Sequence, residues 1–201
     1  DMAVGRRTPV AFSDISSIKI REELGSRDLP MILNTTPGVY ATQSGGGDGD
    51  ARVNIRGFNQ RNVSVMVDGI PMNDMENGWV YWSNWFGLDN VTQKTQVQRG
   101  LGASKLAVPA IGGNINILTQ GIEEKFSVRL SSELGNNNNM RQGFGLNSGR
   151  LKGNWGITAA FSYKQNDGWV EQLNSEQMLW NPLLKRDLSL RRGNLTLNHS
   201  T

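Results

Sequence analysis

Few residues in this chain can carry covalent or metal chemistry. Its 201 residues include one histidine and no cysteine, which excludes disulfides, thiolate metal sites, Fe–S clusters and cysteine nucleophiles. The histidine, His199, lies close to the C-terminal end of the sequence, which argues against a Ser-His-Asp triad and against a multi-histidine metal site. We therefore expect no catalytic residue, no cofactor and no enzymatic activity.

Two further patterns fall short of a ligand site. Asp48 and Asp50 lie in a glycine-rich stretch, but Arg52 stands where a calcium loop needs its third ligand. Gly100-Leu101-Gly102 begins a dinucleotide fingerprint, and Lys105 then replaces its third glycine. The sequence therefore predicts neither a metal site nor a nucleotide site.

Aromatic side chains gather between residues 73 and 89. Their rings can stack on a sugar, a peptide or an aromatic chelate. The alternative is that they pack inside the protein, against the inner wall of a barrel. The candidate substrate-binding residues of this aromatic loop are Trp79, Tyr81, Trp82 and Trp85.

The charged residues give no sign of a nucleic-acid partner. There are 21 basic and 18 acidic residues, a formal charge of +3, and the basic residues form only isolated pairs such as Lys185-Arg186. No stretch reaches the ~18 consecutive apolar residues that a membrane-spanning helix needs. One long uncharged stretch, 106–122, contains Pro109 and several glycine and asparagine residues that disfavour a helix.

The elements that must position these residues change in kind near residue 120. Before it, residues 26–33 combine a capping serine with apolar residues at helical spacing, and Thr36-Pro37-Gly38 ends this predicted helix. Short strand-like runs are separated by loops rich in Gly, Asn and Asp. We expect a small α+β unit with a modest mixed sheet, whose strands cover residues 10–15, 39–42, 52–56, 63–67, 95–98 and 115–118.

From Phe126 onward, apolar and polar residues alternate. Three runs, 126–134, 140–147 and 155–164, have about the length of tilted strands that cross a membrane. Trp155 near one end of the third run suits the aromatic girdle of a membrane barrel. A soluble antiparallel sandwich is the alternative, but its strands usually have only about 5–6 residues. We therefore expect antiparallel strands of an outer-membrane β-barrel.

The region after Glu171 fits this pattern less well. Residues 178–187 have no strand period, and the apolar phase changes at Arg191-Arg192-Gly193. A β-bulge shifts the phase by one residue in this way. Two non-adjacent pieces that are numbered as if continuous give the same result, so both interpretations stay open for residues 175–201.

Three segments of the first region together resemble the plug domain of TonB-dependent outer-membrane receptors. They are Leu33–Val39 (LNTTPGV), Asn54–Pro71 (with NIRGF and VSVMVDGIP), and Val97–Thr119 (with VQRG and AIGGNINILT). Barrel-like strands follow directly, so the resemblance covers residues 10–165. The motif residues with a structural role in this resemblance are Arg56, Gly57, Asp68, Gly69, Arg99, Gly100, Gly112 and Gly113.

The resemblance implies an N-terminal lead-in over 1–9, a plug domain over 10–120 and, over 121–201, the first strands of an incomplete transmembrane β-barrel that is 22-stranded in the family. It also implies a receptor in the cell outer membrane that binds a scarce nutrient, such as a siderophore, glycan or peptide, and imports it with energy from TonB. No recognisable TonB box precedes Val10, so the segment that binds TonB is absent, disordered or farther upstream. The alternative is a receptor-like barrel that acts as a non-transporting subunit or client of a larger outer-membrane assembly or secretion complex, with a surface lipoprotein as a partner.

Two motif arginines, Arg56 and Arg99, can link plug and barrel. Their guanidinium groups suit carboxylates of the barrel wall, and ion pairs inside the plug are an equal alternative. The chain departs from the family pattern where Leu101 replaces a proline and Gln96 replaces a glutamate. The amino-acid sequence of the aromatic loop and of the stretch after Arg99 looks most like that of receptors of the Bacteroidetes group.

Overall fold

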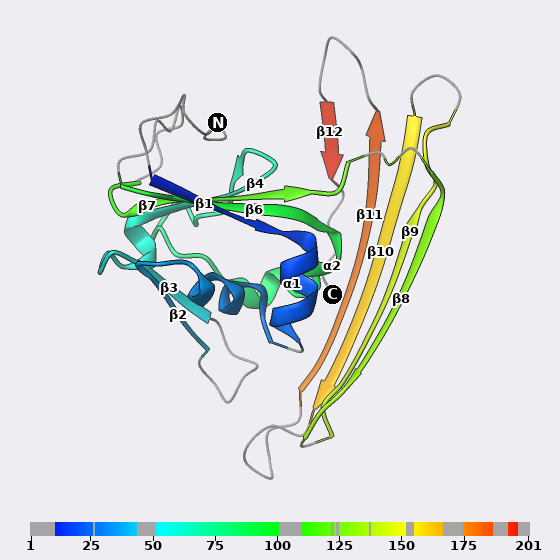
Figure 1. Ribbon diagram of the computed structural model, residues 1–201, viewed down its shortest axis with the longest axis horizontal. Coiled ribbons are helices and arrows are strands. Elements are labelled where there is room, and N and C mark those ends of the chain that lie inside the picture. The colour runs from blue at the N-terminus through cyan, green and yellow to red at the C-terminus, as the bar shows by residue number, and fades with distance from the viewer. Residues whose placement is uncertain are drawn as a thin grey trace. The chain divides into compact units, whose positions relative to one another are not determined.

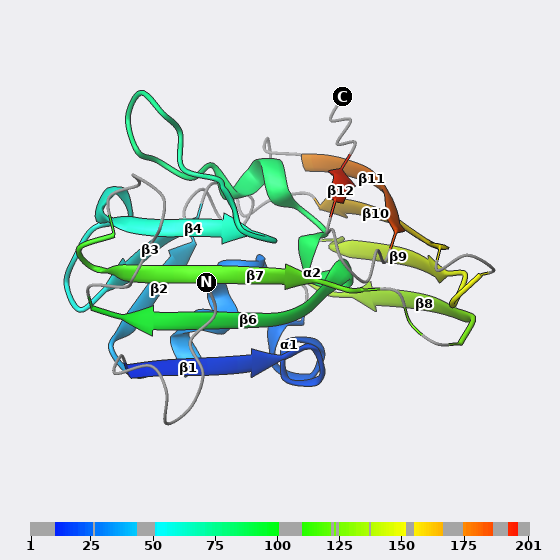
Figure 2. The same cartoon turned by 90° about the horizontal axis from the view of Figure 1, so that it is seen from above.

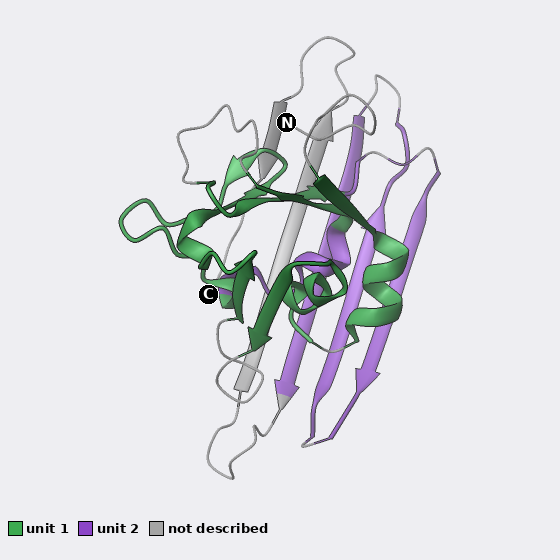
Figure 3. Ribbon diagram, turned by 60° about the vertical axis from the view of Figure 1, so that its left-hand side comes forward, with its two compact units in different colours: residues 1–83, 92–119 green, residues 84–91, 120–201 purple. Residues whose placement is uncertain are grey.

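The computed structural model describes residues 11–25, 27–43, 51–100, 110–121, 123, 125–136, 138–151, 155–166, 175–186 and 193–196. They form two compact units, coloured separately in Figure 3. The first unit contains residues 1–83 and 92–119, and the second contains 84–91 and 120–201. Several positions used in the sequence-based predictions lie outside the described residues. They are the lead-in over 1–9, the capping Ser26, the stretch with Asp48 and Asp50, and the positions Leu101 and Lys105.

The first unit is built on a five-stranded mixed sheet (Figure 2). Only the pair β4–β7 is parallel, and the other neighbours are antiparallel, so the predicted small mixed sheet is confirmed. In spatial order the strands are β1 (Ala11–Ser16), β6 (Thr92–Arg99), β7 (Gly113–Thr119), β4 (Val63–Val67) and β5 (Ile70–Pro71).

Short helices and a two-stranded ribbon cover one face of this sheet (Figure 1). The side chains that α1 and η1 bury there, together with the apolar strand residues, form the core of the first unit. These elements are α1 (Ser17–Leu24), the 3₁₀ helices η1 (Leu29–Thr35) and η3 (Gln60–Asn62), and the ribbon of β2 (Val39–Gln43) and β3 (Ala51–Ile55). The largest core side chains include Ile15, Ile20, Leu24, Ile32, Leu33, Ile55, Ile115 and Ile117.

The α-helix of this region lies earlier in the chain than the helix predicted over residues 26–33. The α-helix is α1, and its N-terminus is capped by Ser16, whose hydroxyl accepts a hydrogen bond from the backbone N–H of Lys19 at 3.3 Å. Residues 29–35 form a 3₁₀ helix with Pro30 in its first turn. Proline lacks the N–H that a helix interior needs but is accepted in the first turn, so the helical turn begins at Leu29, directly before Pro30, and later than predicted.

The second unit contains an antiparallel sheet in the order β12-β11-β10-β9-β8 (Figure 1). Exposure alternates along its strands: Leu130 and Leu134 are 78% and 82% exposed, whereas Arg141, Thr158 and Ser162 are buried. The predicted alternation is therefore confirmed, and these exposed apolar and buried polar side chains follow the pattern of membrane barrels. The strands are β8 (Ser127–Leu134), β9 (Met140–Asn147), β10 (Trp155–Asn166), β11 (Ser175–Arg186) and β12 (Gly193–Thr196).

β11 lies where the sequence shows no strand period. It pairs with β10 from Ser175 to Arg186 without a register shift, so the backbone ladder and not the side-chain pattern defines it. The change of apolar phase near residue 192 falls between β11 and β12, which begins at Gly193. Residues 187–192 between these strands lie outside the described part, so both interpretations of residues 175–201 stay predictions. None of the described helices is both long and apolar enough to span a membrane.

Candidate functional site

Two of the motif dipeptides form the same kind of turn. Arg56 and Gly57 have φ of 52° and 82°, and Asp68 and Gly69 have φ of 49° and 85°. In each case the flanking residues pair as antiparallel strand partners, Ile55 with Phe58 and Val67 with Ile70. Two-residue hairpin loops with positive φ at both positions match the right-handed twist of strands, and glycine at the second position adopts that φ without strain.

The Asp68 carboxylate fastens its turn to the end of β7. It accepts hydrogen bonds from the backbone N–H of Thr119 at 2.9 Å and from the hydroxyl of the same residue. The backbone N–H of Asp68 donates to the carbonyl oxygen of Ile117 at 2.8 Å. The side chain thus extends the parallel pairing of β4 and β7 beyond the last strand residue.

The glycine pair Gly112-Gly113 lets three backbone segments approach closely. A Cβ atom at Gly112 would lie 2.5 Å from the Cβ atom of Phe58, and one at Gly113 would lie 2.4 Å from the carbonyl oxygen of Gln98. Neither contact is compatible with a side chain. Gly112 also accepts a hydrogen bond from the backbone N–H of Gly100 at 3.4 Å, so two motifs meet at this point.

The motif arginines complete this cluster within the first unit. The backbone N–H of Arg56 donates to the carbonyl oxygen of Gly38 at 2.8 Å, and its guanidinium lies beside Gly100. The Arg99 guanidinium donates to the carbonyl oxygen of Pro37 at 3.0 Å and to the Ser13 hydroxyl at 3.2 Å. For Arg99 the contacts are therefore inside the plug, as in one of the two alternatives, but with neutral oxygens in place of carboxylates. All three family motifs converge on this motif cluster.

Within the aromatic loop, Trp82 belongs to the core and is not available to a ligand. It is 4% exposed, and its indole N–H donates to the side-chain oxygen of Gln60 at 3.0 Å. The same oxygen accepts from the backbone N–H of Val53 at 3.1 Å, and the amide nitrogen donates to Val80 at 2.8 Å. Trp82 is therefore a packing residue of the first unit itself, joined to a buried amide whose polar atoms all have partners. Packing of the aromatic residues against the inner wall of a barrel stays a prediction.

Two other aromatic residues of the first unit remain accessible. Tyr81 is 40% exposed, and its hydroxyl accepts a hydrogen bond from the side-chain amide of Asn77 at 3.1 Å. Trp79 is half-buried, with the Arg61 guanidinium 5.2 Å from its ring centroid. The preceding turn is closed by the Asp74 carboxylate, which accepts hydrogen bonds from the backbone N–H groups of Glu76 and Asn77. The loop therefore presents aromatic surface beside a hydrogen-bonded turn.

Trp85 ends η4 (Trp82–Trp85) and belongs to the second unit, where it is half-buried. In the same unit, Asp89 forms an ion pair with Arg141 of β9, with oxygen to nitrogen distances of 2.6 Å. This pair was missed by sequence reasoning, which placed the arginine in the plug and the carboxylate in the wall. The available signal was an arginine on the polar phase of a barrel strand.

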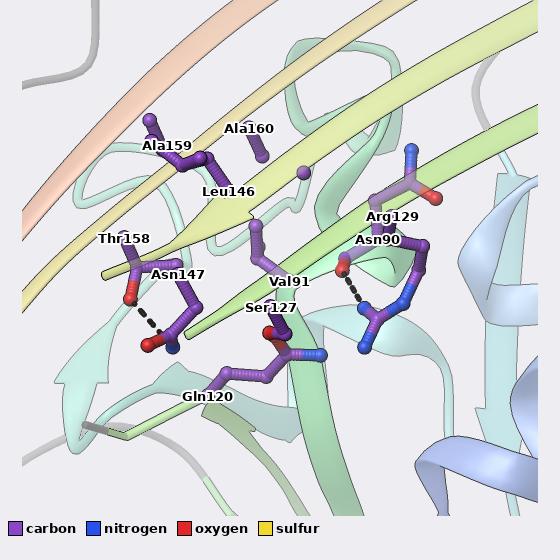
Figure 4. Close-up of a pocket in the computed structure, with 11 residues that line it drawn as sticks. Asn90, Val91, Gln120, Ser127, Arg129, Leu146, Asn147, Thr158, Ala159 and Ala160 are labelled. Carbon is purple, nitrogen blue, oxygen red and sulfur yellow. Dashed lines mark hydrogen bonds between the residues drawn. The ribbon is translucent and has the colours of Figure 1, made fainter. Parts of the chain in front are cut away.

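A small cavity lies on the polar face of the same strands (Figure 4). Its volume is about 20 Å³, which suits about one water molecule and is far below the roughly 300–1,000 Å³ of a small-molecule site. Asn147 donates to the Thr158 hydroxyl at 3.1 Å, and Arg129 donates to the carbonyl oxygen of Asn90 at 3.4 Å. The polar residues around this cavity therefore join neighbouring elements of the second unit, and the cavity is too small to be a nutrient pocket.

The fold and the motif cluster define a class of protein: a plug domain followed by strands of an outer-membrane barrel. The sequence profile of the TonB-dependent receptor plug domain matches residues 5–114, which is more than half of the chain. The chain belongs to this family of TonB-dependent receptors, and its place is the outer membrane.

Similar proteins agree with the family in sequence and in fold. The vitamin B12 transporter BtuB of Vibrio vulnificus is 32% identical over 114 residues, which cover 57% of this chain and 18% of that protein. The ferric enterobactin receptor of Pseudomonas aeruginosa is 32% identical over 120 residues, which cover 54% and 16%. The chain thus spans less than a fifth of the length of these relatives.

Solved structures share the fold at lower sequence identity. FpvA of P. aeruginosa bound to a heterologous pyoverdine superposes with a TM-score of 0.72 at 18% identity, over 92% of this chain and 24% of that one. The siderophore receptor PirA of Pseudomonas aeruginosa gives a TM-score of 0.62 at 24% identity, over 91% and 32%. At these identities the likeness concerns the fold.

Proposed function

We propose that the protein binds a scarce nutrient at the outer face of the outer membrane and imports it through a plugged β-barrel, with energy from TonB. The convergence of the three plug motifs supports this most strongly. Hydrogen bonds join Gly38 to Arg56, Pro37 to Arg99 and Gly100 to Gly112, although these stretches are far apart in the sequence.

The candidate nutrient contacts are now Trp79, Tyr81 and Trp85. Trp79 and Tyr81 offer ring surface beside a hydrogen-bonded turn, and the Arg61 guanidinium beside Trp79 adds a positive charge. This combination suits a ligand with planar or anionic groups, as in a metal chelate. A siderophore or another chelate therefore fits these side chains better than an uncharged glycan or peptide does.

Nutrient-dependent growth tests this proposal. Cells that lack their own receptors would express the full-length protein and grow on cyanocobalamin or ferric enterobactin as the only source of vitamin B12 or iron. We expect growth on one of these probes with TonB and none without it. Growth that does not depend on TonB would contradict energy coupling, and recovery of the full-length protein in the soluble fraction would contradict the barrel.

The second class is a non-transporting subunit of an outer-membrane assembly. Such a subunit has the same fold as a transporter. In the growth experiment it would give no TonB-dependent growth on any nutrient that copurifies with the natively isolated receptor. It would also remain in a stable complex with a surface lipoprotein or another assembly partner after isolation in mild detergent.

We also infer a likeness to Bacteroidetes receptors from two stretches, residues 75–85 and 99–106. The relatives described above come from Vibrio and Pseudomonas and do not support this grouping. It therefore rests on the two stretches alone, and residues 101–106 of the second lie outside the described part. A phylogenetic tree of full-length receptors tests it.

A further inference from the structure

Residues 84–91, here called the wall segment, lie inside the stretch that matches the plug family but pack with the barrel strands. Their helix α2 (Leu88–Val91) contacts β9 and β10 and buries Leu88 and Val91. The wall segment therefore covers part of the polar face of the strands with its own apolar and polar side chains.

A buried ion pair binds the wall segment to β9. The Nη2 atom of Arg141 lies 2.6 Å from both carboxylate oxygens of Asp89, and the two side chains are only 5% and 14% exposed. The ring of Phe86 lies beside the guanidinium of Arg141, and the Cζ atom of this guanidinium is 5.3 Å from the ring centroid. Separation of this pair would leave a charge in a poorly solvated place, which is strongly unfavourable.

Asn90 contacts three strands at once. The side-chain amide of Asn90 donates to the Ser162 hydroxyl in β10 at 2.6 Å. The backbone carbonyl oxygen of Asn90 accepts a hydrogen bond from the Arg129 guanidinium in β8. In β9 the space for this amide exists because residue 143 is glycine: a Cβ atom there would lie 3.1 Å from the Asn90 nitrogen. It would also lie 2.4 Å from the Ser131 hydroxyl. The absence of a side chain at Gly143 thus leaves the space that the Asn90 amide occupies.

The backbone is irregular at both ends of this contact. Gly87 has a φ of 77°, and the register of β6 against β7 shifts between Thr92 and Lys94. Between these points, the carbonyl oxygen of Val91 accepts a hydrogen bond from the backbone N–H of Gln120 at 2.7 Å. A glycine turn inside the wall segment therefore precedes α2, and a register shift of β6 follows it.

We propose that the wall segment is a fixed lining of the barrel wall, which stays bound to β8, β9 and β10 while the rest of the plug rearranges. Asp89 and Asn90 are its positioning residues. This inference rests on the proposed function, because that function requires the first unit to rearrange. It limits the rearranging part to residues before Asn84 and after Val91.

Hydrogen exchange of the full-length receptor in a urea series tests the proposal, because it reports which segments open together. At urea concentrations that open β1 and β4, we expect amides of the wall segment to exchange at least about tenfold more slowly and together with those of β8 to β10. Asp89→Asn should reduce this protection at least about tenfold. Glu76→Gln, the same change in the exposed loop of the first unit, should leave it unchanged.

Exchange of the wall segment together with β1 and β4 in the wild-type receptor would overturn the proposal, as would equal effects of the two acid-to-amide variants. The wild-type comparison needs no variant, so failure of Asp89→Asn to insert does not affect it. The measurement needs no nutrient and no TonB. A negative growth test would therefore count against import and leave the exchange result to be judged by itself.

Discussion

The indole N–H of Trp82 donates to the side-chain oxygen of Gln60 at 3.0 Å, across 22 positions of sequence. The same buried amide binds the backbone of Val53 in β3 and of Val80 in the aromatic loop. One side chain therefore connects the ribbon of the plug to the loop that presents Tyr81.

Gln60→Met should destabilise the first unit. Methionine keeps the volume of glutamine but leaves the N–H groups of Val53 and Trp82 and the carbonyl of Val80 without partners. Each buried group left unpaired costs about 1–3 kcal/mol. Urea-dependent hydrogen exchange of β3 amides in the full-length receptor measures the effect. Gln93→Met, at an exposed position of β6, is the matched control, and an equal loss there would contradict the assigned role of Gln60.

Gly113→Ala should disrupt the motif cluster. The new Cβ atom would overlap the carbonyl oxygen of Gln98, and the φ of 148° is unfavourable for alanine. Overpacking costs about 1–3 kcal/mol. Backbone strain adds about 1–3 kcal/mol. Gly145→Ala is the control, because its Cβ atom would meet only Arg129 at an ordinary 3.7 Å. Protease cleavage of the plug in inserted receptors should rise for the first variant alone, and similar rates would refute the steric argument.

Asp68→Ala and Asp68→Asn should differ. Asparagine tolerates the positive φ of 49° and keeps an oxygen for the backbone N–H of Thr119, so its effect should stay near 1 kcal/mol. Alanine loses both the acceptor and the turn preference, and about 2–4 kcal/mol is expected. Exchange rates of β7 amides distinguish the two variants. Equal losses would show that the negative charge, and not the turn geometry, matters at this position.

Ser64→Ala should be neutral or stabilising. The Ser64 hydroxyl in β4 is fully buried and has no hydrogen-bond partner. Removal of an unpaired buried hydroxyl relieves a desolvation cost of roughly 1–3 kcal/mol. The midpoint of urea-induced exchange in β4 should stay the same or rise. A fall would reveal a bound water that satisfies the hydroxyl.

The parts of the fold that the sequence predicts well are those with a simple local cause. The strand predicted over 63–67 is β4 without a shift, because β-branched valines at alternate positions end at the turn pair Asp68-Gly69. The barrel strands were found through their two-residue period, which reflects one apolar and one polar face. β11 was missed because its pairing with β10 leaves no such trace in its residues.

The candidate site was harder to predict, because its contacts are long-range. Asp89 and Arg141 are 52 positions apart, and nothing near either residue indicates the other. In the aromatic loop, neighbouring tryptophans differ in burial. Trp82 donates a hydrogen bond to the buried Gln60, whereas Trp79 lies against the guanidinium of Arg61. Composition identified the loop, and only tertiary structure separates its core residues from its accessible ones.

Trp79→Ala and Trp82→Ala should therefore have opposite phenotypes. Trp79 is half-buried beside a cation, so its loss should weaken binding of the growth-supporting probe, ferric enterobactin or cyanocobalamin, by about 5- to 100-fold and leave the plug folded. Trp82 is a core side chain, so its loss should cost about 3–5 kcal/mol and expose the plug to protease. Equilibrium binding and protease cleavage, measured on both inserted receptors, separate the two effects. Normal binding by Trp79→Ala would remove it from the ligand site, and a protease-sensitive Trp79→Ala plug would place it in the core with Trp82.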